Sequence, residues 1–305
     1  PQLHCGVEDL GVEHATDTSF HSVVFEYGWE SWVRGLKVVG TPYKALYMPN
    51  SKRCEVRDSV FDRAQNNAGA HAYIGWEHSY DSLMENVTTY DMRHAPVYQW
   101  SSSGNVIRNS VFLNSDAQWH AGWTNENLFE GLIVESSQDG GSYGNGMWSS
   151  GPEDVGHGPN GPRNVIYNCN ITSPKGGVWM GGMNEAWLFL YNRFVVGRGP
   201  AVIAKAASFD HIIQGNVFVM LEPYPSAIYL GSRDCIGIEL INNRFYGDQL
   251  IGGKARPAFE SDNRILQSGN ITRPHPPVRS IYEWQQEHRE EIRAEQLRLA
   301  KLRGR

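Results

Sequence analysis

Few cysteines, no long apolar run and no excess of basic residues characterise this sequence. Its 305 residues include four cysteines without Cys-x-x-Cys spacing or a close pair, so we expect no zinc site. No run of about 18 apolar residues occurs, which predicts that no segment spans a membrane. The net charge of −6 argues against nucleic acid as a partner, because phosphate binding needs a basic face. No signal peptide is visible.

A short apolar motif interrupted by Asn, Asp or Gly recurs ten times along the chain, as in GVEDLGV, EVRDSVF and VIRNSVF. The position two residues before the interruption is apolar in all ten copies, and the position three residues after it is apolar in nine. The interrupting residues are Asp9, Gly35, Asp58, Asn86, Asn109, Gly131, Asn168, Asn192, Gly215 and Asn242.

The spacing of this motif indicates the fold class. Eight of the nine steps between copies measure 22 to 28 residues, and apolar residues alternate rather than recur at helical spacing. Asn, Asp and Gly tolerate a left-handed backbone, so they predict one sharp turn in every repeat. Such a pattern is typical of a solenoid of stacked β coils. Over roughly residues 6 to 250 the chain resembles the right-handed parallel β-helix of the pectate-lyase-like superfamily, which implies one all-β solenoid of about ten rungs.

We predict the parallel β-helix over residues 1–250, with an inserted loop at 136–162, and a C-terminal extension over 251–305. The insertion accounts for the single step of 37 residues, and we expect it to form a wall over a groove. The extension begins Pro-rich and ends in strong helix formers, which predicts a terminal helix. That helix is expected to dock through Trp284 and Ile292 or to contact another subunit.

The first repeat starts only six residues into the chain, with no amphipathic helix before it. Solenoids need a cap, because a bare end exposes apolar core and an unpaired strand edge. We therefore expect a missing N-terminal segment of the same chain, or a second chain in a homo-oligomer, to cover this end.

A second strand is expected about ten residues after each turn, as in PVYQW, QWHAG and GVWMG. Its second and fourth positions are mostly apolar or small, so its third and fifth positions are expected to face outward. Aromatic side chains along an outer groove suit stacking on sugar rings. We therefore predict a polysaccharide or oligosaccharide as the partner, unless loops or a partner subunit cover the aromatic residues. The predicted outer ladder contains Trp76, Tyr98, Trp100, His120, Trp179 and Lys205.

One reaction that fits such a groove is β-elimination from a uronic acid, the reaction of a polysaccharide lyase. A base removes the proton next to the carboxylate while a cation neutralises the acid group. Tyr98 and His120 are expected on adjacent rungs of one outward column, and histidine is a competent base near neutral pH. Lys205 or a Ca²⁺ ion would neutralise the acid group, although Lys205 is expected about 14 Å from His120. No cofactor or metal ligand is assigned.

The other reaction is glycoside hydrolysis or transfer, which needs two carboxylates at a defined separation. We expect an acidic line where the outer strands end, comprising Glu77, Glu126, Glu153, Glu185 and Asp234. The candidate catalytic residues are His120, Tyr98, Glu126, Glu153 and Lys205. The candidate substrate-binding residues are Trp76, Trp100, Trp123, Trp148, Trp179, Glu185 and His157.

The sequence leaves the reaction open. The scarcity of Arg and Lys in the predicted groove favours a neutral glycan, whereas the pairing of Tyr98 with His120 favours a uronate. The alternative to an enzyme is a non-catalytic glycan-binding or structural β-helix of the tailspike or adhesin type. An enzyme is favoured by the gathering of polar residues around the middle rungs and the long loop, namely His94, His120, Glu126, Glu153 and His157. For an enzyme of this kind we expect a secreted or periplasmic location.

Overall fold

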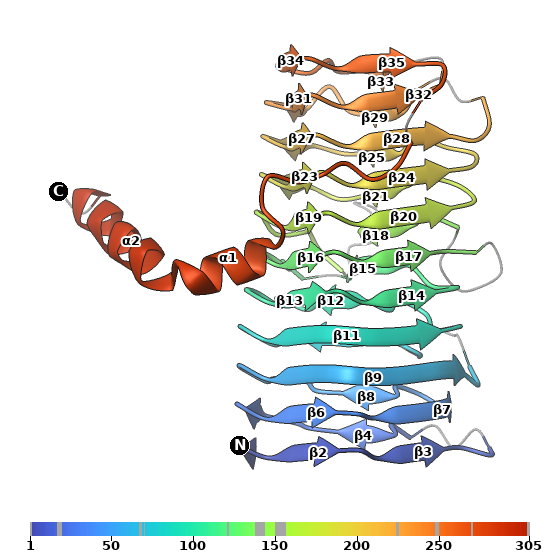
Figure 1. Ribbon diagram of the computed structural model, residues 1–305, viewed down its shortest axis with the longest axis vertical. Helices are drawn as coiled ribbons and strands as arrows, with labels where there is room; N and C mark the ends of the chain where they lie inside the picture. Colours follow the sequence, from blue (N-terminus) through green and yellow to red (C-terminus); the bar gives the residue numbers. More distant parts are fainter. Residues whose placement is uncertain are drawn as a thin grey trace.

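The computed structural model of the chain is a β-solenoid of about ten turns, stacked along the long axis of the molecule (Figure 1). All of the strand pairings described in it are parallel, and each coil bonds to the coils before and after it. The structure describes residues 2–16, 20–66, 69, 71–120, 122–137, 144–149, 157–223, 226–247, 250–269 and 271–303.

In each coil, one strand precedes the left-handed turn and one follows it, and together these strands form one continuous set of hydrogen-bonded strands. Before the turn lie β2 (Gly6–Glu8), β6 (Trp32–Arg34), β13 (Val106–Arg108), β16 (Leu128–Glu130), β19 (Val165–Tyr167), β23 (Leu188–Leu190), β27 (Ile212–Gln214), β31 (Glu239–Ile241) and β34 (Phe259–Ser261). After it lie β3 (Gly11–Glu13), β7 (Lys37–Thr41), β14 (Val111–Leu113), β17 (Ile133–Glu135), β20 (Asn170–Ser173), β24 (Arg193–Val196), β28 (Val217–Met220), β32 (Arg244–Tyr246) and β35 (Arg264–Leu266). Two long strands, β9 (Glu55–Ala64) and β11 (Leu83–Tyr90), run through the turn.

A separate eight-stranded sheet, which we call the outer sheet, closes the other side of the coil. It consists of β10 (Gly75–Glu77), β12 (Val97–Gln99), β15 (Ala117–His120), β18 (Met147–Ser149), β21 (Val178–Met180), β25 (Val202–Ala204), β29 (Ile228–Leu230) and β33 (Ile251–Gly253). Three short sheets complete the coil: β1 (Gln2–Leu3) with β5 (Gly28–Trp29), β4 (Val23–Val24) with β8 (Leu46–Tyr47), and β22 (Asn184–Glu185), β26 (Ser208–Phe209) and β30 (Cys235–Ile236).

The predicted column of left-handed turns is confirmed at nine of its ten positions, with φ between 46° and 68°. The prediction was wrong at Asn192. There the left-handed residue is Tyr191, with φ of 56°, because the strand register places Phe189 beside Ile213 and therefore Tyr191 beside Gly215.

Asn192 belongs instead to a ladder of buried amides inside the coil. Its backbone N and its Nδ2 both donate to Oδ1 of Asn216, at 2.9 and 3.0 Å, and Asn216 repeats this arrangement with Asn243. A second ladder joins Asn105, Asn127 and Asn164. Each buried amide pairs a backbone N–H of the preceding coil, so the ladders satisfy polar groups and help to fix the register between coils.

The turn at Asn109 offers a direct test of the register. Asn109 has φ of 46°, a conformation that a β-branched side chain tolerates poorly. We expect Asn109→Val to lower the free energy of unfolding by about 1–3 kcal/mol, as measured by denaturant unfolding. Asn109→Gly serves as the control and should be close to neutral, because glycine adopts this conformation freely. Equal stability of the valine variant and the wild type would contradict the register.

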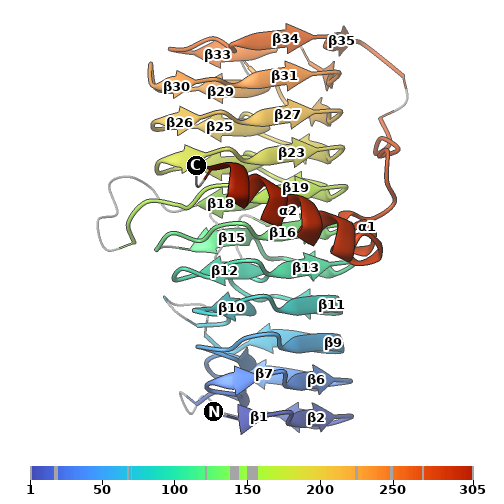
Figure 2. The same ribbon diagram turned by 90° about the vertical axis from the view of Figure 1, so that its left-hand side faces the viewer.

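The parallel pairing continues beyond the predicted boundary at residue 250, through β34 and β35 to Leu266. The chain then runs back across the solenoid, and two helices, α1 (Ile281–Glu287) and α2 (Arg289–Arg303), project from its side (Figures 1 and 2). No helix in the described part of the chain is long and apolar enough to cross a membrane.

Of the two residues expected to dock the predicted C-terminal helix, Ile292 is half-buried and faces a cavity shared with the coil, whereas Trp284 does not dock. Trp284 is 44% exposed and stacks on His288 instead of docking on the coil. The attachment is polar: Glu130 accepts hydrogen bonds from the Ser280 hydroxyl and from the backbone N of Tyr282. Polar side chains of β16 and its neighbours therefore hold the start of α1.

Candidate active site

The register of the outer sheet decides which side chains reach the groove. Trp76, Tyr98 and Trp119 are neighbours on successive strands, and all three are completely buried. The prediction that Trp76 and Tyr98 face outward was therefore wrong. Tyr98 stacks on Phe129 and donates its hydroxyl to the carbonyl oxygen of Leu128 at 2.6 Å. Burial also raises the pKa of Tyr98 well above its usual range. Because its hydroxyl is bonded inside the coil, Tyr98 does not reach a substrate in the groove.

The outward column of these strands consists of Glu77, Gln99 and His120. They face a cavity of about 520 Å³ over the first half of the outer sheet. We call this cavity the cleft. Further lining residues come from the segments just before the strands: Tyr43, Lys44, Tyr73, Arg93 and His94. Trp100, Trp148 and His157, which the sequence predicts as substrate-binding residues, also line it.

A buried ion pair between Lys44 and Glu77 lies at one side of the cleft. Their side chains are 8% and 15% exposed, and Lys44 Nζ donates to Glu77 Oε2 at 2.7 Å. Gln99 Nε2 donates to the same oxygen at 2.7 Å, and the Tyr47 hydroxyl donates to Oε1 at 3.2 Å. Burial lowers the pKa of Lys44, while Glu77 opposes this shift. The contacts engage both Glu77 oxygens and fix the ammonium group at the cleft wall.

A second buried pair orients Arg93. Asp116 and His94 are almost completely buried, and His94 Nδ1 lies 2.8 Å from Asp116 Oδ1. The carboxylate selects the tautomer with a proton on Nδ1, which leaves His94 Nε2 to accept a hydrogen bond from Arg93 Nε at 3.3 Å. Asp116 thus positions the Arg93 guanidinium through His94.

His120 lies among the aromatic rings of this cleft. Its ring centroid is 4.5 Å from that of His157, 5.4 Å from that of Tyr73 and 5.8 Å from that of His94. Burial lowers the pKa of His120 to about 3, with further lowering by His94, His157, Arg93 and Lys44. The imidazole is therefore neutral at physiological pH, in the form that accepts a proton.

A second cavity of about 430 Å³ continues along the outer sheet. Trp148 lines both the cleft and this cavity, and Trp179 is its partner on the next strand. Lys175 and Arg198 stand at the edge of the cavity. The outward position of Trp179 is thus as predicted, and it forms, with Trp148, an aromatic surface next to the cleft.

Three other predicted site residues lie away from the cleft. Glu126 is on a left-handed turn, where it accepts a hydrogen bond from Arg163 Nη2 at 2.6 Å. Trp123 and Glu185 are exposed, and among the described residues neither lines the cleft or the second cavity. Of the described members of the predicted acidic line, Glu77 alone lines the cleft, so these carboxylates do not converge there. Glu153 lies outside the described residues.

Lys205, predicted to neutralise an acid group, also lies outside the cleft. Its Nζ is 5.3 Å from the centroid of the Trp179 ring. Lys205 directly follows β25, which lies three coils beyond β15. The cations of the cleft are Lys44 and Arg93 instead. Among the residues that the structure describes, no group of three or more His, Cys, Asp or Glu side chains is arranged to hold a metal ion.

The predicted loop 136–162 contains part of the site. Within it, β18 pairs with β15 and β21, so Trp148 belongs to a regular strand of the outer sheet. Lys44, Tyr73, Arg93 and Asp116 were not predicted as site residues. Tyr73, Arg93 and Asp116 lie one to four positions before the outer strands β10, β12 and β15, and Lys44 lies two positions before β8. Strand periodicity alone does not evaluate these segments.

Buried neutral histidines predict that the fold is sensitive to acid. Burial lowers the pKa of His211 to about 3, and its Nδ1 accepts a hydrogen bond from the backbone N of Trp187 at 3.0 Å. The folded pKa lies below the unfolded value of about 6.5, so the stabilisation is complete above pH 6.5 and is lost as the pH falls towards 3. His120 and His21, with pKa values lowered to about 3 and about 4, act in the same direction.

We expect His211 alone to reduce the unfolding free energy by up to about 1.4 kcal/mol per pH unit in this window. Denaturant unfolding at several pH values measures the slope. His211→Asn keeps an acceptor for Trp187, as in the asparagine ladders, and should flatten the slope. An unchanged slope in this variant would show that His211 is not the buried neutral group described.

No model of a known protein family matches the sequence, and no curated protein matches it significantly. Among solved structures, the A-module of mannuronan C-5 epimerase AlgE6 from Azotobacter vinelandii has a TM-score of 0.66 and 12% identity, covering 87% of this chain and 74% of that one. The A-module of the epimerase AlgE4 from the same organism has a TM-score of 0.56 and 14% identity, covering 90% and 74%. The adhesin PfbA of Streptococcus pneumoniae has a TM-score of 0.49 and 11% identity, covering 89% and 86%. The chain thus has a parallel β-helix fold, as the repeat predicts.

Proposed function

We propose that this protein is a carbohydrate-active enzyme that removes the proton next to the carboxylate of a uronic acid residue in an acidic polysaccharide. The observation that carries the proposal is that the imidazole of His120 lies in one cleft with Arg93 and Lys44. Loss of the 4-linked sugar from the resulting carbanion gives β-elimination, and return of a proton to the opposite face gives epimerisation. Both outcomes share the first step.

Each cleft residue has a role in that step. Arg93, positioned by His94 and Asp116, and Lys44, positioned by Glu77, would bind the substrate carboxylate and stabilise the charge that develops when the proton leaves. His120 would take the proton. Tyr73, whose ring is near both His120 and His94, would act as the acid that returns a proton to the leaving oxygen or to carbon.

Burial is the main cause of the low pKa of His120, and the positive charges of Arg93 and Lys44 are among the groups that lower it further. A bound carboxylate would compensate these two charges, so the pKa of His120 would rise when an acidic substrate binds. The base would thus gain proton affinity in the enzyme–substrate complex. A neutral glycan gives no such compensation, which supports an acidic substrate.

The aromatic surface next to the cleft supports a polymer as the substrate. Trp148 and Trp179 lie on adjacent strands, about 4.8 Å apart, a spacing that lets one sugar chain contact both rings. Two fold neighbours are named as mannuronan C-5 epimerases, so this fold accommodates the chemistry that we propose. Their likeness to this chain is one of fold alone. The secreted or periplasmic location stays a prediction.

Two-carboxylate hydrolysis fits the described part of the cleft less well. Both oxygens of Glu77 are engaged by Lys44, Gln99 and Tyr47, and Asp116 is buried behind His94. Neither carboxylate is placed to protonate a glycosidic oxygen while the other activates a water on the opposite face of the sugar.

Polyuronates paired with their carboxyl-reduced, neutral counterparts test the proposal. We expect turnover of the acidic polymer alone, seen as ultraviolet absorbance of an unsaturated sugar for a lyase or as altered stereochemistry without cleavage for an epimerase. New reducing ends without unsaturation would instead indicate hydrolysis. Binding of the whole panel without turnover would indicate a non-catalytic, adhesin-like β-helix. Either result would contradict the proposal.

A further inference from the structure

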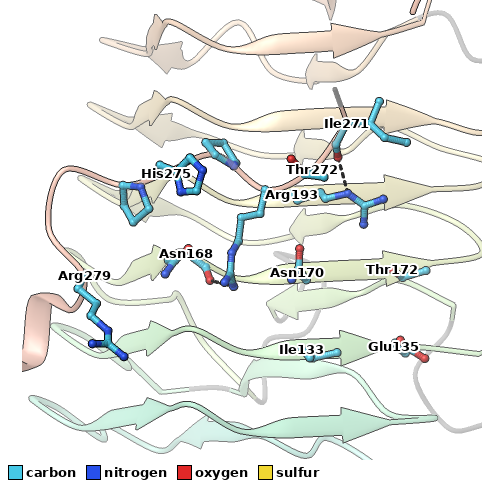
Figure 3. Close-up of a pocket in the computed structure, with 13 residues that line it drawn as sticks. Ile133, Glu135, Asn168, Asn170, Thr172, Arg193, Ile271, Thr272, His275 and Arg279 are labelled. Carbon is cyan, nitrogen blue, oxygen red and sulfur yellow. Dashed lines mark hydrogen bonds between the residues drawn. The ribbon is translucent and has the colours of Figure 1, made fainter. Parts of the chain in front are cut away.

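A cavity of about 840 Å³ lies where the C-terminal segment crosses back over the solenoid, and we call it the tail pocket (Figure 3). Its floor consists of outward side chains of β17, β20 and β24, including Ile133, Asn170 and Thr172. Residues 271–279 of the C-terminal segment form its wall. The tail pocket therefore spans three neighbouring coils.

The tail pocket is strongly cationic in a chain whose net charge is −6. Arg193, Arg273, Arg279 and His275 line it, together with a single carboxylate, Glu135. Figure 3 shows Arg279 at one end and Glu135 at the opposite end, so the positive charge at Arg279 lies away from the carboxylate of the lining.

Two of these arginines also hold the wall in place. Arg193 Nε donates to the carbonyl oxygen of Ile271 at 2.6 Å, and Arg273 Nη1 donates to that of Asn168 at 2.7 Å. A guanidinium group has five N–H donors, so each bond uses one of them. The C-terminal segment is thereby fastened to the sheet, which makes the cavity a preformed feature of the fold.

We propose that the tail pocket binds an extended anionic oligosaccharide. Three coils at about 4.8 Å spacing distribute the charges over about 10 Å, which matches successive acidic sugars better than one compact anion. Guanidinium groups bind carboxylate or sulfate groups in a bidentate manner. The side chains of Asn170, Thr172 and Thr272 are suited to pair with sugar hydroxyl groups.

This site is separate from the cleft. The tail pocket lies over β17, β20 and β24, whereas the cleft lies over the outer sheet. In Figure 1 the C-terminal segment crosses the front of the solenoid, and the outer sheet lies behind. The inference therefore does not depend on the reaction proposed for the cleft.

Calorimetric titration of the intact chain tests the proposal. The probes are a hexameric oligouronate, a sulfated hexasaccharide, a neutral hexasaccharide and inorganic phosphate, and the background carries Arg93→Gln to weaken binding in the cleft. We expect one remaining binding event for an acidic oligosaccharide. The two acidic probes distinguish carboxylate from sulfate as the preferred group.

Two variants locate that binding event. Arg279→Gln removes an exposed cation that makes no described bond holding the wall, and Asn170→Asp adds a negative charge with little change of shape. Each should weaken binding about tenfold at low salt, with an unchanged melting temperature. Arg34→Gln, on the distant strand β6, is the matched control and should have no effect.

Three results would overturn the proposal. One is the absence of binding in the Arg93→Gln background, and another is an Arg279→Gln variant that binds like the Arg34→Gln control. The third is phosphate binding as tight as that of the oligosaccharides, which would indicate a site for compact anions. None of these outcomes bears on turnover in the cleft, so each is distinguishable from failure of the proposed function.

Discussion

Replacing His120 by alanine is expected to lower kcat on an acidic polysaccharide by about 10²–10⁴-fold, the usual contribution of a positioned general base. The melting temperature should stay nearly unchanged, because His120 lies on the outward column of β15. Its proposed role is that of a proton acceptor that burial, His94, His157 and Arg93 keep neutral. Steady-state kinetics together with thermal unfolding of the same preparation measures both quantities.

The matched control is Tyr229→Ala. Tyr229 faces the same side of the outer sheet, on β29, and lines neither the cleft nor the second cavity. It should leave kcat unchanged. If His120→Ala unfolds the protein instead, β15 faces the opposite way, and if it retains full turnover, another group is the base.

Replacing Trp76 by alanine is expected to cost about 3–5 kcal/mol of unfolding free energy, as truncation of a fully buried large aromatic side chain does. Trp76 is 0% exposed and lies on β10, one of the strands that carry the cleft, with its side chain inside the coil. Trp100→Ala is the matched comparison, because Trp100 lines the cleft and is partly exposed. It should weaken substrate binding at a much smaller cost in stability.

Denaturant unfolding of both tryptophan variants, with binding measured for each folded one, separates the two roles. The comparison tests the corrected orientation of the outer sheet directly. A stability loss for Trp76→Ala as small as that for Trp100→Ala would restore the orientation that the sequence suggests, in which both side chains face outward.

The solenoid is predictable from sequence because its turn is constrained by the backbone. A left-handed residue in every coil restricts the choice mostly to Asn, Asp and Gly, and the flanking strands must alternate to fill one core. The prediction fails at Asn192 for an informative reason. Asparagine serves both in the turn column and in the buried amide ladder one residue later, and Tyr191 occupies the turn with φ of 56°.

Which side chains of the outer sheet point into the coil is harder to predict, because both sides of this sheet carry aromatic residues. Trp76, Tyr98 and Trp119 fill the coil interior, while Trp148 and Trp179 lie on the outer face. A shift of one residue exchanges the two sides of a strand. Hydrophobicity cannot detect such a shift where large rings stand on both sides.

The cleft is only partly predictable because its side chains come from segments outside the repeat. His120, His157, Trp100 and Trp148 were identified from sequence, and all line the cleft. Lys44 and Arg93 precede their strands by a few residues and meet only when the coils stack. Their presence reverses the expectation of a groove poor in cations, and with it the preference for a neutral glycan.

The most direct test of the account is the reaction run in D₂O with a defined oligouronate. NMR and mass spectrometry of the recovered sugar then report whether the carbon next to the carboxylate has lost its proton. The account predicts deuterium at that carbon in an epimerised product, or its conversion into the double bond of an unsaturated one, and neither product with His120→Ala. Cleaved products in which that carbon keeps its original proton would contradict the account.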